Sequence, residues 1–275
     1  MRYFCQPHSC HYVKKPKIGR MRYMFVKNIV LLHGWGASVE KLKPLGKSLE
    51  KLGWKVLIPK LPGFDAPAPQ IAWELVNYSD YIFEQVRKKW GKKKYYIFGH
   101  SFGGRIAIKL AKENSPNLAG VVLCATGGLS RGNPFKRVIF FVLAKIGKIF
   151  LFFMPFAKAW KKFLYKIACE HDYEKSQGIM RNVFKKIISE NLKPLIQSIE
   201  VPVLTLWGEN DVVTPFTDAL FIKKTISKSK LVSFQNDGHK LPYEKPRELA
   251  REIDKWAIKE NRVSSSSGPN RKKKT

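Results

Sequence analysis

The sequence predicts an α/β fold in which a mostly parallel sheet of about six strands has helices on both faces and carries an inserted helical lid. Two observations lead to this prediction. Short apolar runs alternate along the chain with longer stretches whose apolar residues recur at helical spacing. This alternation stops between about residues 129 and 196 and resumes afterwards. Regular alternation of strand and helix gives a parallel sheet covered on both faces.

The expected elements begin at residue 28. Strands are expected at 28–32, 55–58, 95–98, 120–123, 202–206 and 231–234, and helices at 38–52, 73–90, 102–114, 215–227 and 244–260. The strand segments are almost continuously apolar, which is typical of parallel strands buried on both sides. Residues 24–261 are therefore expected to form one domain, with the lid inserted at about 129–196.

The remaining segments are expected to lie outside this core. Residues 1–23 lack periodicity, so they are expected to be a disordered extension or the product of too early a start codon. Residues 262–275 are expected to form a disordered basic tail. Within the lid, Val138–Phe156 is apolar except for Lys145, Gly147 and Lys148. Two lysines near its middle make a membrane span costly, so this segment is expected to cover a site or to touch a membrane surface.

The strand at 95–98 runs into Gly99-His100-Ser101-Phe102-Gly103-Gly104 and then into a helix. This strand, sharp turn and helix form the context of a nucleophile elbow, in which a serine sits on a strained turn. Small residues at 99 and 103 allow the strand and helix to approach closely. Ser101 is therefore the predicted nucleophile.

A serine needs a base, and the base needs a carboxylate to orient it. The carboxyl ends of parallel strands meet at one edge of the sheet, so both partners are expected after later strands. Asp211 follows the strand at 202–206, and His239 follows the strand at 231–234. The order Ser101, Asp211, His239 matches the template. Glu209 is the alternative acid, and Asp237 is expected to shape the turn before the histidine.

An oxyanion hole is expected from two backbone N–H groups, that of Phe102 and one in the first loop. The loop His33-Gly34-Trp35-Gly36 follows the first strand directly, and Trp35 is the expected donor. The ordinary alternative is that this segment is only a turn. The other histidines, His100 included, are expected to be structural.

Together these segments resemble the α/β-hydrolase family over residues 28–260. The resemblance rests on His33-Gly34-Trp35-Gly36, Leu61-Pro62-Gly63-Phe64, Gly99-His100-Ser101-Phe102-Gly103-Gly104, Gly208-Glu209-Asn210-Asp211 with Pro215, and Gly238-His239, in family order. It implies a Ser-His-Asp mechanism and a helical cap. Two departures are visible: Lys60 stands where an aspartate often precedes the Leu-Pro-Gly loop, and little room is left for two initial antiparallel strands, so a shortened sheet is implied.

The amino-acid composition limits the classes of partner that we expect. The net charge of +30 favours anionic partners in general, but the basic residues are scattered, so no specific nucleic acid is expected, and a lysine-rich background explains the charge equally well. Of four cysteines, Cys124 and Cys169 read as neutral thiols. Cys5 and Cys10 interleave with histidines too closely for a metal site, and we expect no metal and no cofactor. Without an apolar secretory signal, a cytoplasmic location is expected.

These observations predict a serine hydrolase that cleaves a carboxylic ester or thioester of a small or lipid-like substrate. A peptidase or a carbon–carbon bond hydrolase on the same triad is the first alternative. The second is a non-catalytic protein that binds a membrane surface or an anion. Phe140 and Phe153 of the lid are candidates for substrate contact, although an aromatic-rich stripe more often forms the lid's own core. Peripheral contact with an anionic membrane is also considered.

Overall fold

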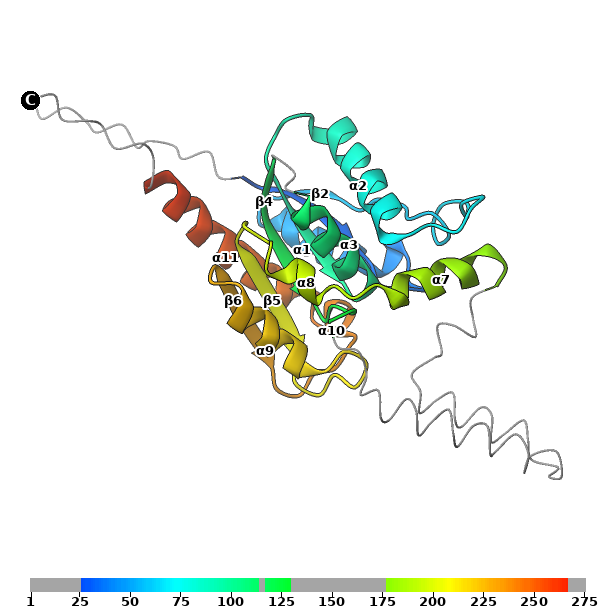
Figure 1. Ribbon diagram of the computed structural model, residues 1–275. Coiled ribbons are helices and arrows are strands. Elements are labelled where there is room, and N and C mark those ends of the chain that lie inside the picture. Colours follow the sequence, from blue (N-terminus) through cyan, green and yellow to red (C-terminus); the bar gives the residue numbers. More distant parts are fainter. Residues whose placement is uncertain (1–25, 114–116, 130–176, 267–275) are drawn as a thin grey trace, which may run out of the picture.

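The computed structural model describes residues 26–113, 117–129 and 177–266 (Figure 1). In chain order the elements are β1 (Asn28–Leu32), α1 (Val39–Lys51), β2 (Lys55–Leu57), α2 (Leu75–Trp90), β3 (Tyr95–His100), α3 (Phe102–Lys112), β4 (Leu118–Cys124), α7 (Ile179–Ser189), α8 (Lys193–Ile196), β5 (Val203–Gly208), α9 (Phe216–Thr225), β6 (Ser229–Phe234), α10 (Leu241–Glu244) and α11 (Pro246–Ser266).

The six strands form one sheet in the order β2-β1-β3-β4-β5-β6, and every pair is parallel. This confirms the predicted α/β fold with a mostly parallel sheet of about six strands. The central strands β3 and β5 are buried at every position, which explains why they appear in the sequence as continuous apolar runs. Their carboxyl ends, at His100 and Gly208, lie on the same edge of the sheet.

Helices cover both faces, and each face has its own apolar core (Figure 1). Helices α2, α3 and α9 pack on one face, where Trp207 is fully buried. Helices α1, α10 and α11 pack on the other face, where Trp256 is fully buried. Truncating a buried side chain of this size typically costs about 3–5 kcal/mol. The two cores therefore hold the strand ends, and the loops that follow them, in fixed relative positions.

The structure differs from the sequence-based boundaries at the end of the chain. Helix α11 extends to Ser266, into the range 262–275 that we expected to be a disordered tail. Asn261, just before this range, is bonded to the sheet: its amide oxygen accepts a hydrogen bond from Val26 N–H, and its amide nitrogen donates to the Tyr96 hydroxyl. These contacts tie the last turns to the start of the sheet.

Several predictions lie outside the described residues. They concern the segment 1–23, most of the lid (130–176) with Phe140 and Phe153, and the chain after 266. The described end of the lid range consists of α7 and α8. Within the described residues, no helix is long and apolar enough to cross a membrane, and no cluster of histidine, cysteine and carboxylate side chains could hold a metal ion.

Candidate active site

Ser101 lies in the turn between β3 and α3, with the backbone angles φ 51° and ψ −107°. A positive φ is uncommon for a residue with a side chain and costs of order 1–3 kcal/mol. The surroundings enforce it: Ser101 N–H donates to Cys124 O at 3.1 Å, and Ser101 O accepts from Gly104 N–H at 3.1 Å. The turn is thus a strained elbow that begins helix α3.

Two glycines make room for this elbow. A methyl group on Gly99 would overlap the carbonyl oxygen of Gly103, and one on Gly103 would overlap the carbonyl oxygen of Leu32. These are backbone atoms, which cannot move aside as a flexible side chain could. Strand β3, strand β1 and helix α3 can therefore meet at Ser101 only with glycine at both positions.

Asp211 and His239 come from the loops after β5 and β6, and the structure brings them together. His239 Nδ1 lies 2.8 Å from Asp211 Oδ2. Because a carboxylate only accepts, Nδ1 carries the proton and donates it, and Nε2 is left as the free basic nitrogen of the neutral ring. The Asp211 side chain is fully buried, whereas that of His239 is 19% exposed.

Further donors hold the Asp211 carboxylate in place. Oδ1 accepts from the N–H groups of Val213 and Thr214, both at 2.8 Å, and Oδ2 accepts from the Thr214 hydroxyl at 2.7 Å. Burial alone would raise the pKa of Asp211, but the bonds from His239 and Thr214 outweigh it, so the pKa lies below its ordinary value. The carboxylate is therefore charged at neutral pH.

The two other carboxylates weighed in the sequence lie elsewhere. Glu209 is exposed, and Asp237 forms an ion pair with Lys245 at 2.8 Å. The Asp237 carbonyl accepts from Asn210 N–H at 3.0 Å, so this residue does link the loops after β5 and β6. Thr214 was missed by sequence analysis. Its position three residues after an aspartate, just before a helix, is typical of a local turn in which the two side chains bond each other.

The first loop lies against the elbow. His33 O accepts from Gly103 N–H at 3.1 Å, and Gly34 O accepts from Ala37 N–H at 3.2 Å, which closes the turn that contains Trp35. A methyl group on Gly34 would lie 3.3 Å from Ser101 Cβ, so the loop passes beside the serine. Trp35 and Phe102, the two predicted donors, are in contact through their rings, with centroids 5.3 Å apart.

Aromatic side chains surround these two residues. Phe64 packs on both Trp35 and Phe102, at ring distances of 4.9 and 5.8 Å, and Phe184 of α7 lies 4.9 Å from the Trp35 ring. Tyr78 of α2 packs edge-on against Phe102 at 5.1 Å. The side of the elbow that faces α7 is therefore an apolar wall. Phe184 was not singled out from the sequence, because its helix is separated from the other wall residues along the chain.

Helix α7 is held over this wall by Arg105, one turn after Ser101. The guanidinium donates to Ile187 O and, at 2.9 Å, to Glu190 O, which are carbonyls at the C-terminal end of α7. Arg105 is 6% exposed, and burial lowers its pKa to about 10 although Glu190 opposes the shift. Lys109, one turn further along α3, pairs with the Glu190 carboxylate at 2.9 Å. The helix of the elbow thus anchors α7.

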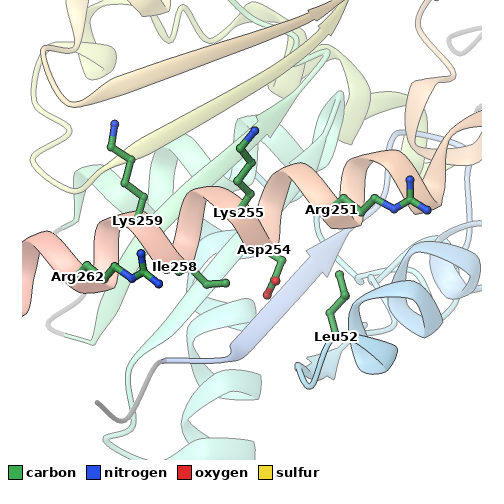
Figure 2. Close-up of a pocket in the computed structure, with 7 residues that line it drawn as sticks. All are labelled: Leu52, Arg251, Asp254, Lys255, Ile258, Lys259 and Arg262. Atoms are coloured by element: carbon green, nitrogen blue, oxygen red, sulfur yellow. The ribbon is translucent and has the colours of Figure 1, made fainter. Parts of the chain in front are cut away.

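A hollow of about 470 Å³ lies away from this site, along the middle of α11 (Figure 2). Its lining combines two apolar side chains, one acid and four basic residues, namely Leu52, Ile258, Asp254, Arg251, Lys255, Lys259 and Arg262. Asp254 is already paired there, with Lys27 Nζ and with Trp54 Nε1, both at 2.8 Å. The hollow is lined by none of Ser101, Asp211 and His239, so it is separate from the candidate active site.

Residues 26–246 match the hydrolase family described as serine aminopeptidase, S33. The chain belongs to this family. It is therefore a hydrolase, as the sequence predicted. The match begins just before β1 and ends at the first residue of α11, so it includes Ser101, Asp211 and His239.

Characterised relatives of this hydrolase are similar over most of their length. A pimeloyl-acyl-carrier-protein methyl ester esterase of Neisseria meningitidis is 26% identical over 233 residues, which is 78% of this chain and 87% of the relative. A monoacylglycerol lipase of Mus musculus is 25% identical over 256 residues, with 82% and 74% covered. Lipase 1 of Psychrobacter immobilis is 20% identical over 232 residues, with 77% and 70% covered.

Solved structures share the fold. A lipase-esterase related protein from Clostridium acetobutylicum superposes with a TM-score of 0.61 at 20% identity, covering 85% of this chain and 96% of its own. An esterase from Exiguobacterium antarcticum gives 0.63 at 18% identity, with 84% and 92% covered. These similarities confirm the predicted α/β-hydrolase fold.

Proposed function

We propose that this hydrolase cleaves a carboxylic ester or thioester through an acyl-enzyme, with Ser101 as nucleophile, His239 as base and Asp211 as the acid that orients it. The observation that carries the proposal is the 2.8 Å contact between His239 Nδ1 and the buried Asp211 carboxylate, at the sheet edge where Ser101 begins α3. It leaves His239 Nε2 free to accept a proton, which is the requirement for activating a serine.

In the first half of the reaction, Ser101 Oγ attacks the acyl carbon while His239 Nε2 takes the hydroxyl proton. The carbonyl oxygen becomes an oxyanion, for which the N–H groups of Phe102 and Trp35 are the proposed donors. Removing one such donor typically costs about 100- to 1000-fold in rate. The bond from carbon to the leaving oxygen or sulfur then breaks, and His239 returns its proton to the departing alcohol or thiol.

In the second half, water replaces the leaving group. His239 takes a proton from the water, whose oxygen attacks the acyl carbon, and the bond to Ser101 Oγ breaks as the proton returns to the serine. The products are a carboxylic acid and the free enzyme. Asp211 remains ionised throughout and stabilises the imidazolium that forms in each half. No step needs a metal or a cofactor.

The apolar wall beside Ser101 supports an apolar acyl group. Trp35, Phe64 and Phe184 are partly exposed and offer ring faces and edges there. The relatives named as lipases and as a methyl ester esterase support ester hydrolysis over peptide hydrolysis. The family description, in contrast, names an aminopeptidase, and carbon–carbon hydrolysis uses the same kind of triad. We therefore retain both reactions as outcomes of the test.

Reaction with a fluorophosphonate probe tests the nucleophile. We expect the wild-type protein to be labelled at Ser101 and Ser101→Ala to remain unlabelled. Ser48→Ala is the matched control, because this α1 hydroxyl bonds only its own helix backbone, at Pro44 O, and lies away from the elbow. Labelling that survives Ser101→Ala, or that never occurs in the wild type, would contradict the proposal.

A panel of substrates then separates the reactions. We expect turnover of p-nitrophenyl esters and of acyl thioesters, with kcat/KM rising as the acyl chain lengthens along the apolar wall. Aminoacyl p-nitroanilides test the peptidase alternative, and a vinylogous diketone tests carbon–carbon cleavage. If either of these substrates gives a higher kcat/KM than the best ester, the proposed ester specificity is wrong, but the assignment of Ser101 as nucleophile is unaffected.

The surface of α11 supports peripheral contact with an anionic membrane as a secondary property. Arg247, Arg251, Lys255 and Lys259 recur every four residues and are exposed, so they form one stripe along the helix. Within the described residues, no carboxylate lies at ion-pair distance from the last three of them. Leu52 and Ile258 line the same hollow as the last three of these residues (Figure 2), so this surface is both charged and apolar.

Sedimentation with vesicles tests this contact. We expect the protein to pellet with vesicles rich in phosphatidylserine, and the triple variant Arg251→Glu, Lys255→Glu, Lys259→Glu to lose most of this binding. A second triple variant with the same change in charge, at Lys88, Lys89 and Lys92 near the end of α2, is the control. Equal losses in both variants would mean that net charge, and not the stripe, causes the binding.

A further inference from the structure

His100, the residue before the predicted nucleophile, is buried and bonded on both ring nitrogens. It is the last residue of β3 and is 3% exposed. Its Nε2 lies 2.8 Å from the backbone carbonyl of His239, and its Nδ1 lies 3.1 Å from the hydroxyl of Tyr243 in α10. The Tyr243 ring also packs edge-on against the imidazole at 5.1 Å. The proposed proton transfer uses neither of these side chains.

The direction of each hydrogen bond follows from its partners. A carbonyl oxygen only accepts, so His100 Nε2 carries a proton and donates it to His239 O. Burial, and then the nearby His239, lower the pKa of His100 to about 3, so the ring is neutral and Nδ1 has a lone pair. The Tyr243 hydroxyl therefore donates to Nδ1.

The first loop packs against this pair. Gly34 lies close to the imidazole: a methyl group on it would be 3.0 Å from His100 Nδ1. The chain of hydrogen bonds runs from the Tyr243 hydroxyl to His100 Nδ1 and from His100 Nε2–H to His239 O, with Gly34 against its centre.

These contacts bring together three segments that hold the proposed machinery. His100 precedes Ser101, and its Nε2–H bonds the backbone of His239, the proposed base. Gly34, which packs against the imidazole, precedes Trp35, the proposed oxyanion donor. The three segments lie at the ends of β1, β3 and β6, which are separated by long stretches of sequence, and the sheet itself fixes only the strand ends. The directional bonds of His100 and the packing of Gly34 fix the adjoining loops as well.

We propose that His100 and Tyr243 form a positioning pair that fixes the nucleophile relative to the base through a directional chain of hydrogen bonds, against which the oxyanion loop packs. The inference rests on the proposed function, since it concerns the same site. Its alternative is a buried pair that contributes only to folding. The two readings differ in kinetics: a positioning pair affects the chemical step, whereas a merely stabilising pair affects only the fraction of folded enzyme.

Tyr243→Phe is the test, because it removes the hydroxyl and keeps the ring that packs on His100. We expect kcat for a short p-nitrophenyl ester, corrected for active-site concentration, to fall about 10- to 100-fold with KM changed less than about twofold. The rate of fluorophosphonate labelling should fall in parallel. Tyr96→Phe is the matched control: its buried hydroxyl also takes part in one side-chain bond, from Asn261, but at the opposite edge of the sheet, so kcat should be unchanged.

The protonated ring nitrogen provides an independent measurement. Two-bond proton–nitrogen spectra of histidine-labelled wild-type protein should show His100 as the neutral form with the proton on Nε2 from about pH 5 to 8, the range in which an ordinary histidine titrates. A proton on Nδ1, titration within this range, or an unchanged kcat in folded Tyr243→Phe would overturn the inference. If Tyr243→Phe does not fold, the spectra of the wild type still decide the direction of the chain.

Failure of the proposed function is distinguishable from failure of this inference. If the wild type reacts with no fluorophosphonate and no ester, the proposed function is wrong, and the spectra then test the hydrogen-bond chain by itself. If the wild type turns over esters and Tyr243→Phe does so equally well, only the positioning pair is wrong.

Discussion

Replacing Asp211 with asparagine keeps the shape of the side chain and changes only its hydrogen-bond polarity. In the structure, Oδ1 accepts from the N–H groups of Val213 and Thr214, and Oδ2 accepts from the Thr214 hydroxyl and from His239 Nδ1. The asparagine oxygen must accept from the two backbone N–H groups. If the amide nitrogen took its place, its N–H groups would face two other N–H donors and neither side could form a hydrogen bond. The amide nitrogen therefore points at His239.

The expected loss follows from the histidine tautomer. The asparagine amide donates to His239 Nδ1, so the ring proton moves to Nε2, the nitrogen that must receive the Ser101 proton. A wrong tautomer in a correctly folded triad lowers kcat about 10⁴-fold, which corresponds to about 5.5 kcal/mol of barrier. The fold should survive, because the two backbone bonds and the volume of the side chain are retained.

Steady-state hydrolysis of a p-nitrophenyl ester measures this loss, and circular dichroism checks that Asp211→Asn is folded. Glu209→Gln is the control, because Glu209 is an exposed carboxylate in the same loop. Its kcat should stay within about twofold of the wild type, as expected for a surface substitution. If Asp211→Asn retains more than a tenth of wild-type kcat, or if Glu209→Gln loses as much, the assignment of the acid is refuted.

Three further predictions concern stability and local order. Gly99→Ala places a methyl group against the Gly103 carbonyl, so the free energy of unfolding, measured in urea, should fall by about 1–3 kcal/mol and activity should be lost. A variant as stable and active as the wild type would contradict the close approach. Arg105→Met removes the guanidinium that donates to carbonyls at the C-terminal end of α7. Hydrogen exchange of the α7 amides should therefore accelerate, whereas exchange in the sheet should not change. Equal exchange of the α7 amides in the variant and the wild type would show that Arg105 does not anchor α7. Because the pKa of Asp211 is lowered on folding, its ionisation stabilises the fold fully above the ordinary value of 3.8, and this contribution disappears as the pH falls through the folded pKa. The stability difference between wild type and Asp211→Asn should therefore shrink below about pH 4, and a constant difference would refute it.

The fold could be predicted because parallel strands buried on both faces leave a clear local pattern. Strand β3 is apolar from Tyr95 to Phe98 and is buried throughout, so its run in the sequence is unbroken. The start of the edge strand β6 was harder to predict. It begins at Ser229, two residues before the expected start, because its first two residues, Ser229 and Lys230, are polar and do not extend the apolar run. Strand ends on a sheet edge depend on pairing, which the local sequence does not specify.

The positions of the site loops could be predicted for the same topological reason. The carboxyl ends of parallel strands meet at one edge, so chain order alone brought the loops of Ser101, Asp211 and His239 to one place. The order of the motif favoured Asp211 over Glu209, whereas the burial that distinguishes the two carboxylates could not be predicted from the local sequence.

The supporting contacts were not predictable. Tyr243 meets His100 across 143 positions of sequence, and Arg105 meets the carbonyls of α7 across more than 80. Neither contact produces periodicity, a motif or a spacing that could be recognised locally. Both depend on how helices α7 and α10 dock on the sheet, which is decided by packing over the whole domain.

The order of the strands also has a consequence for folding kinetics. Ser101 belongs to the half of the sheet formed by β1, β3 and β4, whereas Asp211 and His239 follow β5 and β6, and the two halves meet only where β4 pairs with β5. Pairing between segments so distant in sequence is slow, because the connecting chain must lose its freedom first. During refolding, helical content should therefore return before catalysis does, and regained turnover would mark the moment at which the two halves of the sheet join.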